Sequence, residues 1–174
     1  MLRPLLFFPA FVLLFSCNTV NRNANVDPSE KKLMKEAVSA GEGYVRGQLG
    51  KAKKTVSKDG LIVLSDPDSK YLIDPSRIVT GEIDDDSVRD AIVPVYLFRN
   101  QNLISTEHLF LINKNGRLTI ATSVISDMKV LSVKDRIIFV EVPNVARDSP
   151  NFGCGICKDV VKYKYSGDSL SVVE

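Results

Sequence analysis

Hydrophobic and polar positions change their spacing about a third of the way along this 174-residue chain. From Leu33 onward, apolar and small residues recur every three to four positions, which is the period of one helix face. Asp27, Pro28 and Glu30 precede this stretch and suit the cap and first turn of a helix. The pattern predicts a helix of about 26 residues that ends near Val56.

Short runs of β-branched and aromatic residues follow, separated by turn residues, which is typical of strands. The predicted strands cover residues 61–64, 77–83, 91–99, 103–113, 117–125, 136–142, 160–165 and 170–173. Turns of hairpin length lie at 100–102, 113–116 and 166–168. Consecutive hairpins build an antiparallel meander, because parallel strands need long crossovers. Pro94 cannot donate to a ladder, so we expect its strand to be at an edge or bulged there.

The order of these elements predicts the fold class. One long N-terminal helix packed on an antiparallel β-sheet meander is an α+β arrangement. Residues 28–174 have the length of a single domain. Val, Ile and Leu are plentiful in this range, so we expect an ordinary hydrophobic core.

The first sixteen residues have the layout of a secretory signal peptide, with a basic start and a short apolar stretch. That stretch is shorter than the roughly 20 residues that a membrane-spanning helix needs, so we expect residues 1–16 to be removed. Leu14-Phe15-Ser16-Cys17 resembles the bacterial lipobox, in which signal peptidase cuts before a lipid-modified cysteine. Phe15 departs from the smaller residue usual at that position. The alternative is a secreted or uncleaved form without lipid.

Lipid on Cys17 would make residues 17–27 a tether between membrane and domain, because this stretch is rich in Asn and has no apolar period. We therefore expect a lipid-anchored protein of the bacterial cell envelope, on its periplasmic or extracellular side. The membrane would be its partner through Cys17. Export would separate the chain from nucleic acid, so we expect no nucleic-acid partner.

Cys154 and Cys157 stand directly before a predicted strand. If Cys17 carries lipid, they are the remaining pair in a chain with three cysteines. Three interpretations stay open: a structural disulfide, a redox-active pair and half of a metal site. A thioredoxin-type site places its first cysteine at the start of a helix, and a zinc site needs about four ligands in all. The pattern favours the structural disulfide.

An acidic loop between two predicted strands is a candidate metal site. Oxygen ligands at alternate positions of a loop suit a hard cation such as calcium. Carboxylates with that spacing are Glu82, Asp84, Asp86 and Asp90. Ser87 stands where such loops have a glycine for a sharp turn. The pattern therefore favours the alternative, an acidic turn whose carboxylates accept hydrogen bonds from the loop's own amides.

His108 is the only histidine in the sequence, and it lies on a predicted strand. Adjacent strand residues point to opposite faces, so its neighbour Glu107 cannot form a catalytic dyad with it. We expect a partly exposed strand histidine. No G-x-S-x-G, P-loop or H-E-x-x-H motif occurs in the sequence, so we expect no enzyme.

Charge is segregated along the chain. Residues 28–58 hold eight basic and three acidic side chains, and residues 59–90 hold nine acidic and three basic ones. A basic helix close to a lipid anchor suits contact with anionic head groups. Alternatively, the helix pairs with the acidic loop or simply faces water, and we expect one of these structural roles.

Three segments together resemble a family of small uncharacterised bacterial lipoproteins: the acidic loop at 81–90, the apolar strand and turn at 109–116, and the cysteine pair with its closing strands at 154–170. That family has a helix, a degenerate G-D-x-N-G-D-G-x-x-D loop, a hairpin and a late cysteine pair. The resemblance implies export and an α+β domain, and it supplies no activity. The family more often has adjacent cysteines followed by proline, whereas this chain has Cys154-Gly-Ile-Cys157.

The sequence therefore predicts an exported, membrane-anchored lipoprotein that acts as a non-enzymatic binding or structural module of the cell envelope. One alternative is a calcium-dependent binding module that uses the acidic loop. The other is a thiol-disulfide enzyme that uses Cys154 and Cys157. We expect no cofactor, and calcium would be bound only under the less favoured alternative that uses the acidic loop.

Overall fold

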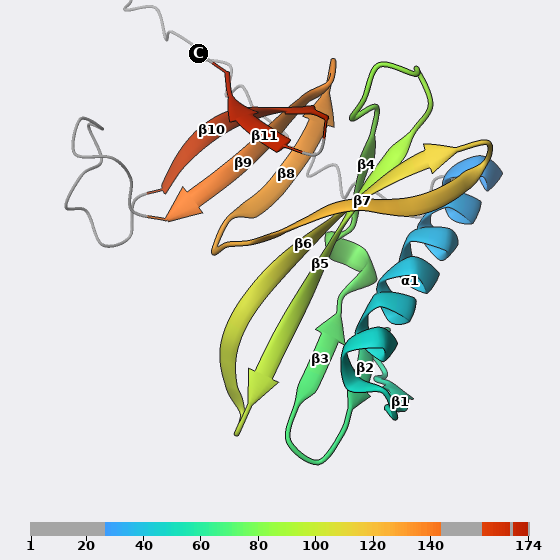
Figure 1. Ribbon diagram of the computed structural model, residues 1–174, viewed down its shortest axis with the longest axis vertical. Helices are drawn as coiled ribbons and strands as arrows, with labels where there is room; N and C mark the ends of the chain where they lie inside the picture. Colours follow the sequence, from blue (N-terminus) through green and yellow to red (C-terminus); the bar gives the residue numbers. More distant parts are fainter. Residues whose placement is uncertain (1–26, 144–157, 168, 174) are drawn as a thin grey trace, which may run out of the picture.

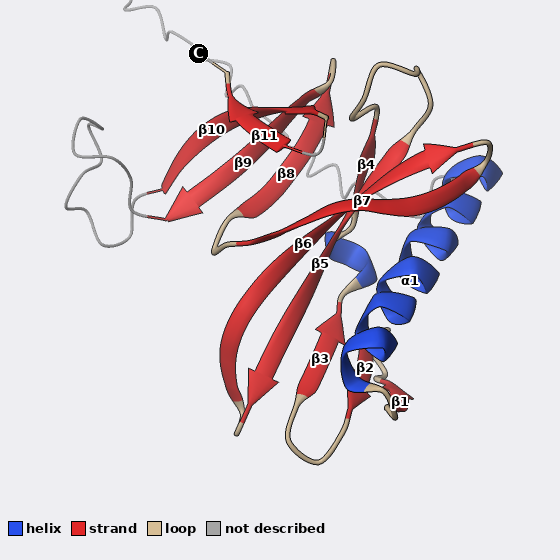
Figure 2. Ribbon diagram, viewed as in Figure 1, coloured by secondary structure: helices blue, strands red, loops and turns tan. Residues whose placement is uncertain are grey.

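The computed structural model describes residues 27–143, 158–167 and 169–173. Within these residues antiparallel strands dominate, and one α-helix covers one side of the molecule (Figure 2). The strands form two sheets, so the predicted single meander under a helix is wrong. The fold is α+β only in the loose sense that one helix packs on a largely β structure.

Each sheet is built from strands that are mostly neighbours in the sequence. Helix α1 spans Pro28–Leu49, and a 3-10 turn spans Pro75–Arg77. The large sheet contains β1 Lys53–Val56, β2 Ile62–Ser65, β3 Lys70–Ile73, β4 Val79–Gly81, β5 Asp90–Arg99, β6 Asn102–Lys114 and β7 Arg117–Ile125. The small sheet contains β8 Lys129–Lys134, β9 Ile137–Pro143, β10 Lys158–Ser166 and β11 Ser169–Val172.

The β5–β6 hairpin is the centre of the large sheet (Figure 1). The strand order is β1-β2-β3-β5-β6-β7, and β4 pairs with β5 beyond the end of β3. The small sheet has the order β11-β10-β9-β8. The turn between β5 and β6 consists of Asn100 and Gln101, both with positive φ, which confirms the hairpin predicted there.

Three layers result: α1, the large sheet and the small sheet. Alternate residues of β5 point to opposite faces, so Val93 packs against α1 while Ile92 packs against the small sheet. Along β6, Leu109 packs against α1 and Phe110 packs against the small sheet. The central hairpin is therefore buried on both faces and belongs to two hydrophobic cores.

Helix α1 lies close to the large sheet because glycine occupies the contact. A Cβ atom at Gly41 would lie 3.2 Å from both Ile73 Cδ1 and Val93 Cγ1. The helix ends at Leu49, because Gly50 adopts a φ of 66° and donates its N–H to the Arg46 carbonyl.

Residues predicted as the last turns of this helix form β1 instead, paired with β2. All four β1 residues are exposed, so backbone pairing rather than burial decides their conformation. The predicted helix was too long because apolar residues continue at helical spacing beyond Leu49, where the helix ends. The predicted strand 77–83 is too long at both ends: Arg77 belongs to the 3-10 turn, and β4 spans only Val79–Gly81.

Besides β1, two further strands, β3 and β8, were not predicted. Strand β3 has only four residues. In β8 the register shifts between Val130 and Ser132, so the inward-facing Val130 and Val133 lie three positions apart. This bulge removes the alternation by which a strand is recognised in a sequence.

Pro94 lies in a central strand, so the expectation of an edge or a bulge at this residue is wrong. Residues 90–92 of β5 pair with β4, and residues 95–98 pair with β3. Pro94 falls in the gap between these two partners. Among the described residues, no strand pairs with β5 at Pro94 on this side, so the ladder needs no hydrogen bond from the proline nitrogen, which has no N–H group.

Gly81 marks the point where the two sheets approach each other, and its substitution should destabilise the fold. A Cβ atom there would lie 2.6 Å from Val133 Cβ and 3.2 Å from the Val133 carbonyl oxygen. We expect Gly81→Ala to lower the free energy of unfolding by about 1–3 kcal/mol, because backbone must move to relieve the overlap. The measurement is equilibrium unfolding in urea.

Gly43→Ala is the matched control. Gly43 lies on the exposed face of α1, and a Cβ atom there would meet no atom within 4 Å. Alanine should stabilise this helix by up to about 1 kcal/mol. Equal destabilisation by both substitutions would contradict the close packing of β4 against β8.

Candidate functional site

A cleft forms where the small sheet leaves part of the large sheet uncovered. The small sheet packs on the end of the central hairpin that holds Ile92 and Phe110. Towards the other end, the same face of the large sheet borders an open cleft of about 870 Å³. Strands β3, β5 and β6 provide its floor, and β8 forms the opposite wall.

The floor is largely apolar and aromatic. Leu72, Tyr96 and Thr106 are direct cross-strand neighbours, so their side chains lie in one row on the same face. Tyr96 and Phe98 are half-buried, and Lys70 Nζ lies 6.0 Å from the centre of the Phe98 ring. Aromatic faces exposed in a concave site suit an apolar or flat ligand group.

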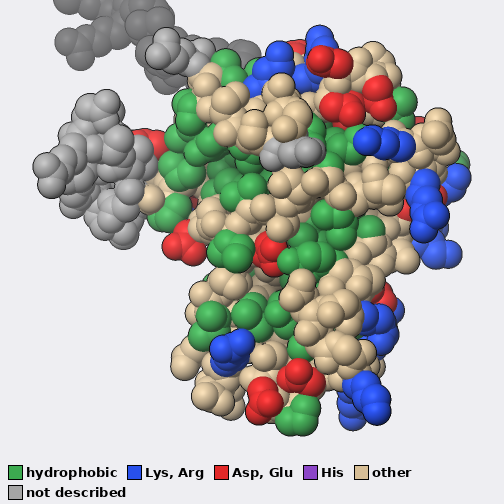
Figure 3. Space-filling view, in the orientation of Figure 1, with side chains coloured by type: hydrophobic (Ala, Val, Ile, Leu, Met, Phe, Trp, Pro, Cys, Tyr) green, Lys and Arg blue, Asp and Glu red, His purple; other side chains and the backbone are tan. Residues whose placement is uncertain are grey.

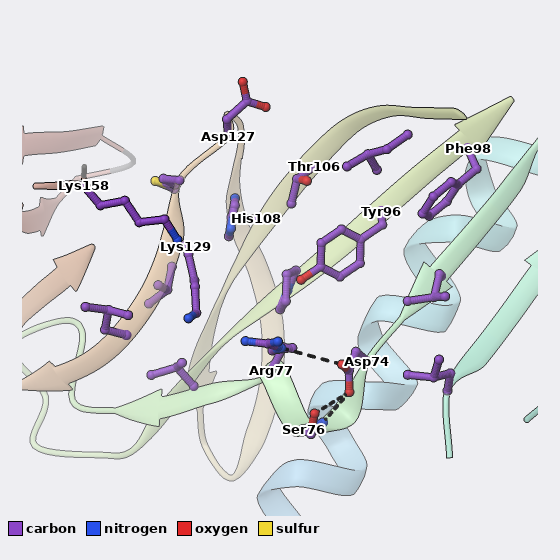
Figure 4. A pocket seen from close by; sticks show the side chains of 18 residues that line it. Asp74, Ser76, Arg77, Tyr96, Phe98, Thr106, His108, Asp127, Lys129 and Lys158 are labelled. Carbon is purple, nitrogen blue, oxygen red and sulfur yellow. Dashed lines mark hydrogen bonds and ion pairs between the residues drawn. The ribbon is translucent and has the colours of Figure 1, made fainter. Parts of the chain in front are cut away.

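Cationic side chains surround this floor (Figure 4). Arg77 projects from the 3-10 turn, with its Nε 3.8 Å from Asp74 Oδ2, and it remains about half exposed. Lys129 extends from β8 on the opposite wall. Lys158 lies beyond Lys129. The rim therefore offers positive charge next to an aromatic surface.

Tyr96 can act as a hydrogen-bond donor at the edge of the floor. Burial raises the pKa of its hydroxyl group, Arg77 lowers it, and Asp74 raises it. The hydroxyl group stays protonated at neutral pH because the net direction is upward.

His108 lies on β6 at the inner end of the cleft (Figure 4). It is 2% exposed, so the expected partial exposure is wrong. Its Nδ1 atom has no hydrogen-bond partner. Burial lowers the pKa of His108, and the backbone groups of Val124 and Met128 oppose this shift.

Glu107 points away from His108, as strand geometry predicts. Its Oε1 accepts a hydrogen bond of 2.7 Å from the Tyr44 hydroxyl group on α1, at the other face of the sheet. Burial and this contact raise the pKa of Tyr44 to about 12. The sequence argument against a dyad of these two neighbours is confirmed.

The acidic loop is organised by its own carboxylates. Asp90 is fully buried, and its two oxygens accept hydrogen bonds from the backbone N–H groups of Ile83 and Asn113, each at 2.8 Å. Asp84 accepts from the Asp86 N–H group at 3.1 Å. The predicted turn stabilised by carboxylate-to-amide bonds is therefore present.

The remaining calcium candidates do not converge with these groups. Asp86 Oδ1 accepts from the Val88 N–H group at 2.8 Å, and Ser87 adopts a φ of 60° without a glycine. No group of three or more His, Cys, Asp or Glu side chains in the described ranges is placed to hold a metal ion, and Glu82 belongs to none.

Three predicted site residues lie outside the described residues: Cys17, Cys154 and Cys157. Lipid attachment and the disulfide therefore stay predictions.

A second hollow of about 650 Å³ lies at the inner side of the small sheet. Apolar side chains that line it include Val124, Val142, Tyr163 and Leu170. Figure 3 shows hydrophobic side chains gathered over the small sheet on this face of the molecule. The hollow adjoins Pro143, the last described residue before 144–157, and it lacks the cations of the first cleft.

The sequence argument missed the cleft. Its residues come from seven separate elements and the loops beside them, and no short motif joins them. One signal was present in β5, where successive residues from Ala91 to Phe98 are apolar on both faces. Such a strand needs cover on both sides, and the uncovered part becomes a binding surface.

Comparisons with known proteins give no match: no family model, no curated protein and no solved structure is similar to the chain. The resemblance to small bacterial lipoproteins therefore stays a prediction. Within the described part of the chain, no helix has both the length and the apolar character needed to cross a membrane.

His108 should make stability depend on pH. Its pKa in the folded state lies below the value of 6.5 for an exposed histidine, so the unfolded chain takes up the proton first. The free energy of unfolding should therefore fall as the pH drops through about 6.5 towards the lowered folded pKa. Urea unfolding at several pH values measures this slope.

His108→Gln is the matched variant, because it removes the chain's only histidine and keeps a polar side chain. The wild-type chain should lose stability relative to this variant as the pH falls through this window. Parallel pH profiles would show that His108 is equally easy to protonate in both states.

Proposed function

We propose that the chain is an exported lipoprotein of the bacterial cell envelope, held on a membrane by lipid on Cys17, and that its domain is a non-enzymatic binding module. The ligand class that fits the cleft is a small amphiphilic organic anion. The observation that carries this proposal is the combination of an aromatic floor with a cationic rim in one open cleft.

Charge and shape together support this ligand class. Tyr96 and Phe98 are partly buried and present part of their aromatic surface to the cleft. Arg77 and Lys129 extend from opposite walls and can approach one anionic group from two sides. Arg77 is only weakly engaged, since its Nε lies 3.8 Å from the Asp74 carboxylate.

The polar groups of the cleft support binding rather than catalysis. Thr106, His108 and Asp127 line the same space. Covalent catalysis needs a nucleophile within hydrogen-bonding distance of a base that a third group orients. Among the described residues no hydrogen bond joins any two of these three, and His108 Nδ1 has no partner. Turnover that requires His108, Cys154 or Cys157 would contradict the proposal.

Cys17→Ser tests the anchor. We expect this substitution to abolish incorporation of labelled palmitate and to move the protein from the membrane fraction to the soluble fraction. Acyl chains contribute about 0.8 kcal/mol per buried CH₂ group, so their loss removes the attachment. The double variant Cys154→Ser/Cys157→Ser should keep both label and membrane attachment. An unmodified Cys17 in the native protein, found by mass spectrometry, would refute the anchor.

Tyr96→Ala tests the cleft, with the aromatic sulfonate 1-anilinonaphthalene-8-sulfonate as the probe. The protein is the mature chain that begins at residue 17 and carries Cys17→Ser. We expect saturable fluorescence enhancement, and Tyr96→Ala should raise the Kd by about tenfold because aromatic contact area is lost. Arg77→Gln should also weaken binding several-fold, since the charged contact to the sulfonate is removed.

Ile120→Ala is the control for these variants, because Ile120 is an exposed β7 side chain that does not line the cleft. The control should keep the affinity of the unsubstituted protein. Thermal unfolding identifies any variant whose fold is loosened. Equal affinity in all folded variants would place the probe elsewhere and contradict the assignment of the cleft.

A further inference from the structure

The small sheet has an outer face, turned away from β5 and β6, that is rich in lysine. Inward positions of its strands hold core residues such as Val133, Ile138 and Val140. Side chains alternate along a strand, so the intervening positions point outward. The exposed outward residues that form this lysine face are Lys129, Lys134, Lys158, Lys162 and Lys164. Of these, Lys129 and Lys158 lie at the edge where the face meets the cleft.

Few acidic side chains balance these charges. The acidic residue among the outward positions of β8, β9 and β10 is Glu141. Its Oε1 lies 2.7 Å from Lys158 Nζ, so one lysine is paired. Four lysines have no ion pair with a described carboxylate: Lys129, Lys134, Lys162 and Lys164. The whole chain has a net charge of only +2, so positive charge is concentrated on this face.

The lysine face has one acidic border. Asp84, Asp85 and Asp86 lie beside Lys164 in a shallow depression at the end of β10. Asp85 is engaged in an ion pair with Arg136, in the turn between β8 and β9. The acidic loop therefore limits the lysine face at this end.

Apolar side chains accompany the lysines. Val160 lies on β10 between Lys158 and Lys162 and is 58% exposed, and Leu131 at the bulge of β8 is 40% exposed. Lysine stems and exposed aliphatic groups together suit the boundary between lipid head groups and acyl chains. A soluble polyanion would use the charges and not the aliphatic groups.

The basic segment that the sequence singled out is less suited to the same role. Lys32 lies 3.8 Å from Glu36 along α1, and Lys54 forms an ion pair with Glu42. Helix α1 and the lysine face lie on opposite outer layers of the molecule, with the large sheet between them. One membrane surface therefore contacts one of them and not both.

We propose that the lysine face rests on the anionic head groups of a membrane. The choice of a membrane rests on the lipid anchor of the proposed function. Figure 1 shows that α1 begins in the half of the molecule that contains the small sheet. The preceding tether, residues 17–27, extends to roughly 36 Å at most, so it keeps the domain close to the lipid surface. A sheet face presents its lysines to a planar surface together.

Vesicle co-sedimentation tests this inference with the mature chain that begins at residue 17 and carries Cys17→Ser. All residues of the two hydrophobic cores lie at position 33 or beyond, so this chain retains them. We expect binding to phosphatidylcholine vesicles that contain about one-third phosphatidylglycerol, and no binding to phosphatidylcholine alone. Raising the salt from about 0.05 M to about 0.5 M should release the protein, because salt screens exposed charges.

The triple variant Lys134→Gln/Lys162→Gln/Lys164→Gln should lower the partition coefficient of the protein onto anionic vesicles about 100-fold. Each lysine contributes a factor of about five to this coefficient. The matched control Lys31→Gln/Lys32→Gln/Lys35→Gln removes the same charge from exposed positions of α1 and should leave binding nearly unchanged. Replacing Lys134, Lys162 and Lys164 by Arg should preserve binding, which separates charge from damage to the sheet.

Three results would overturn the inference. Equal losses in the two Gln variants would mean that net charge, and not this face, drives binding. Absence of binding to anionic vesicles would exclude the membrane as the partner. Binding to a soluble polyanion such as heparin but not to the vesicles would assign the face to a different partner. Because Cys17 is replaced here, failure of this test leaves the palmitate test of the anchor unaffected.

Discussion

Burial of the β5–β6 hairpin on both faces is the constraint on which the rest of this structure depends. Val93 and Leu109 pack against α1, whereas Ile92 and Phe110 pack against the small sheet. A strand that is apolar on both sides cannot be stable in water unless two layers cover it. The helix supplies one layer and strands β8–β11 supply the other, so two cores share one central hairpin.

Incomplete cover by the small sheet explains the cleft. The hairpin is longer than the region that β8–β11 protect, so Tyr96 and Phe98 remain partly exposed beyond its edge. The same edge brings Lys129 opposite Arg77. Binding surface and core are thus parts of one continuous strand face. The proposed ligand site needs no loop of its own.

Polar groups fix how the layers meet. The buried Asp90 carboxylate joins the acidic loop to the end of β6 through the N–H groups of Ile83 and Asn113. A buried acceptor with several donors holds a loop in place more firmly than exposed ion pairs do. This use of the carboxylate explains why a calcium-like spacing builds a turn.

Local patterns in the sequence determined the helix start at Pro28, the hairpin turn at Asn100 and most strand positions, because caps, turns and alternation depend on near neighbours. They also showed that Glu107 and His108 face opposite ways. The burial of His108, the second sheet and the cleft were decided by tertiary structure alone. These features depend on contacts between residues far apart in the chain, and the β8 bulge hides even the local alternation.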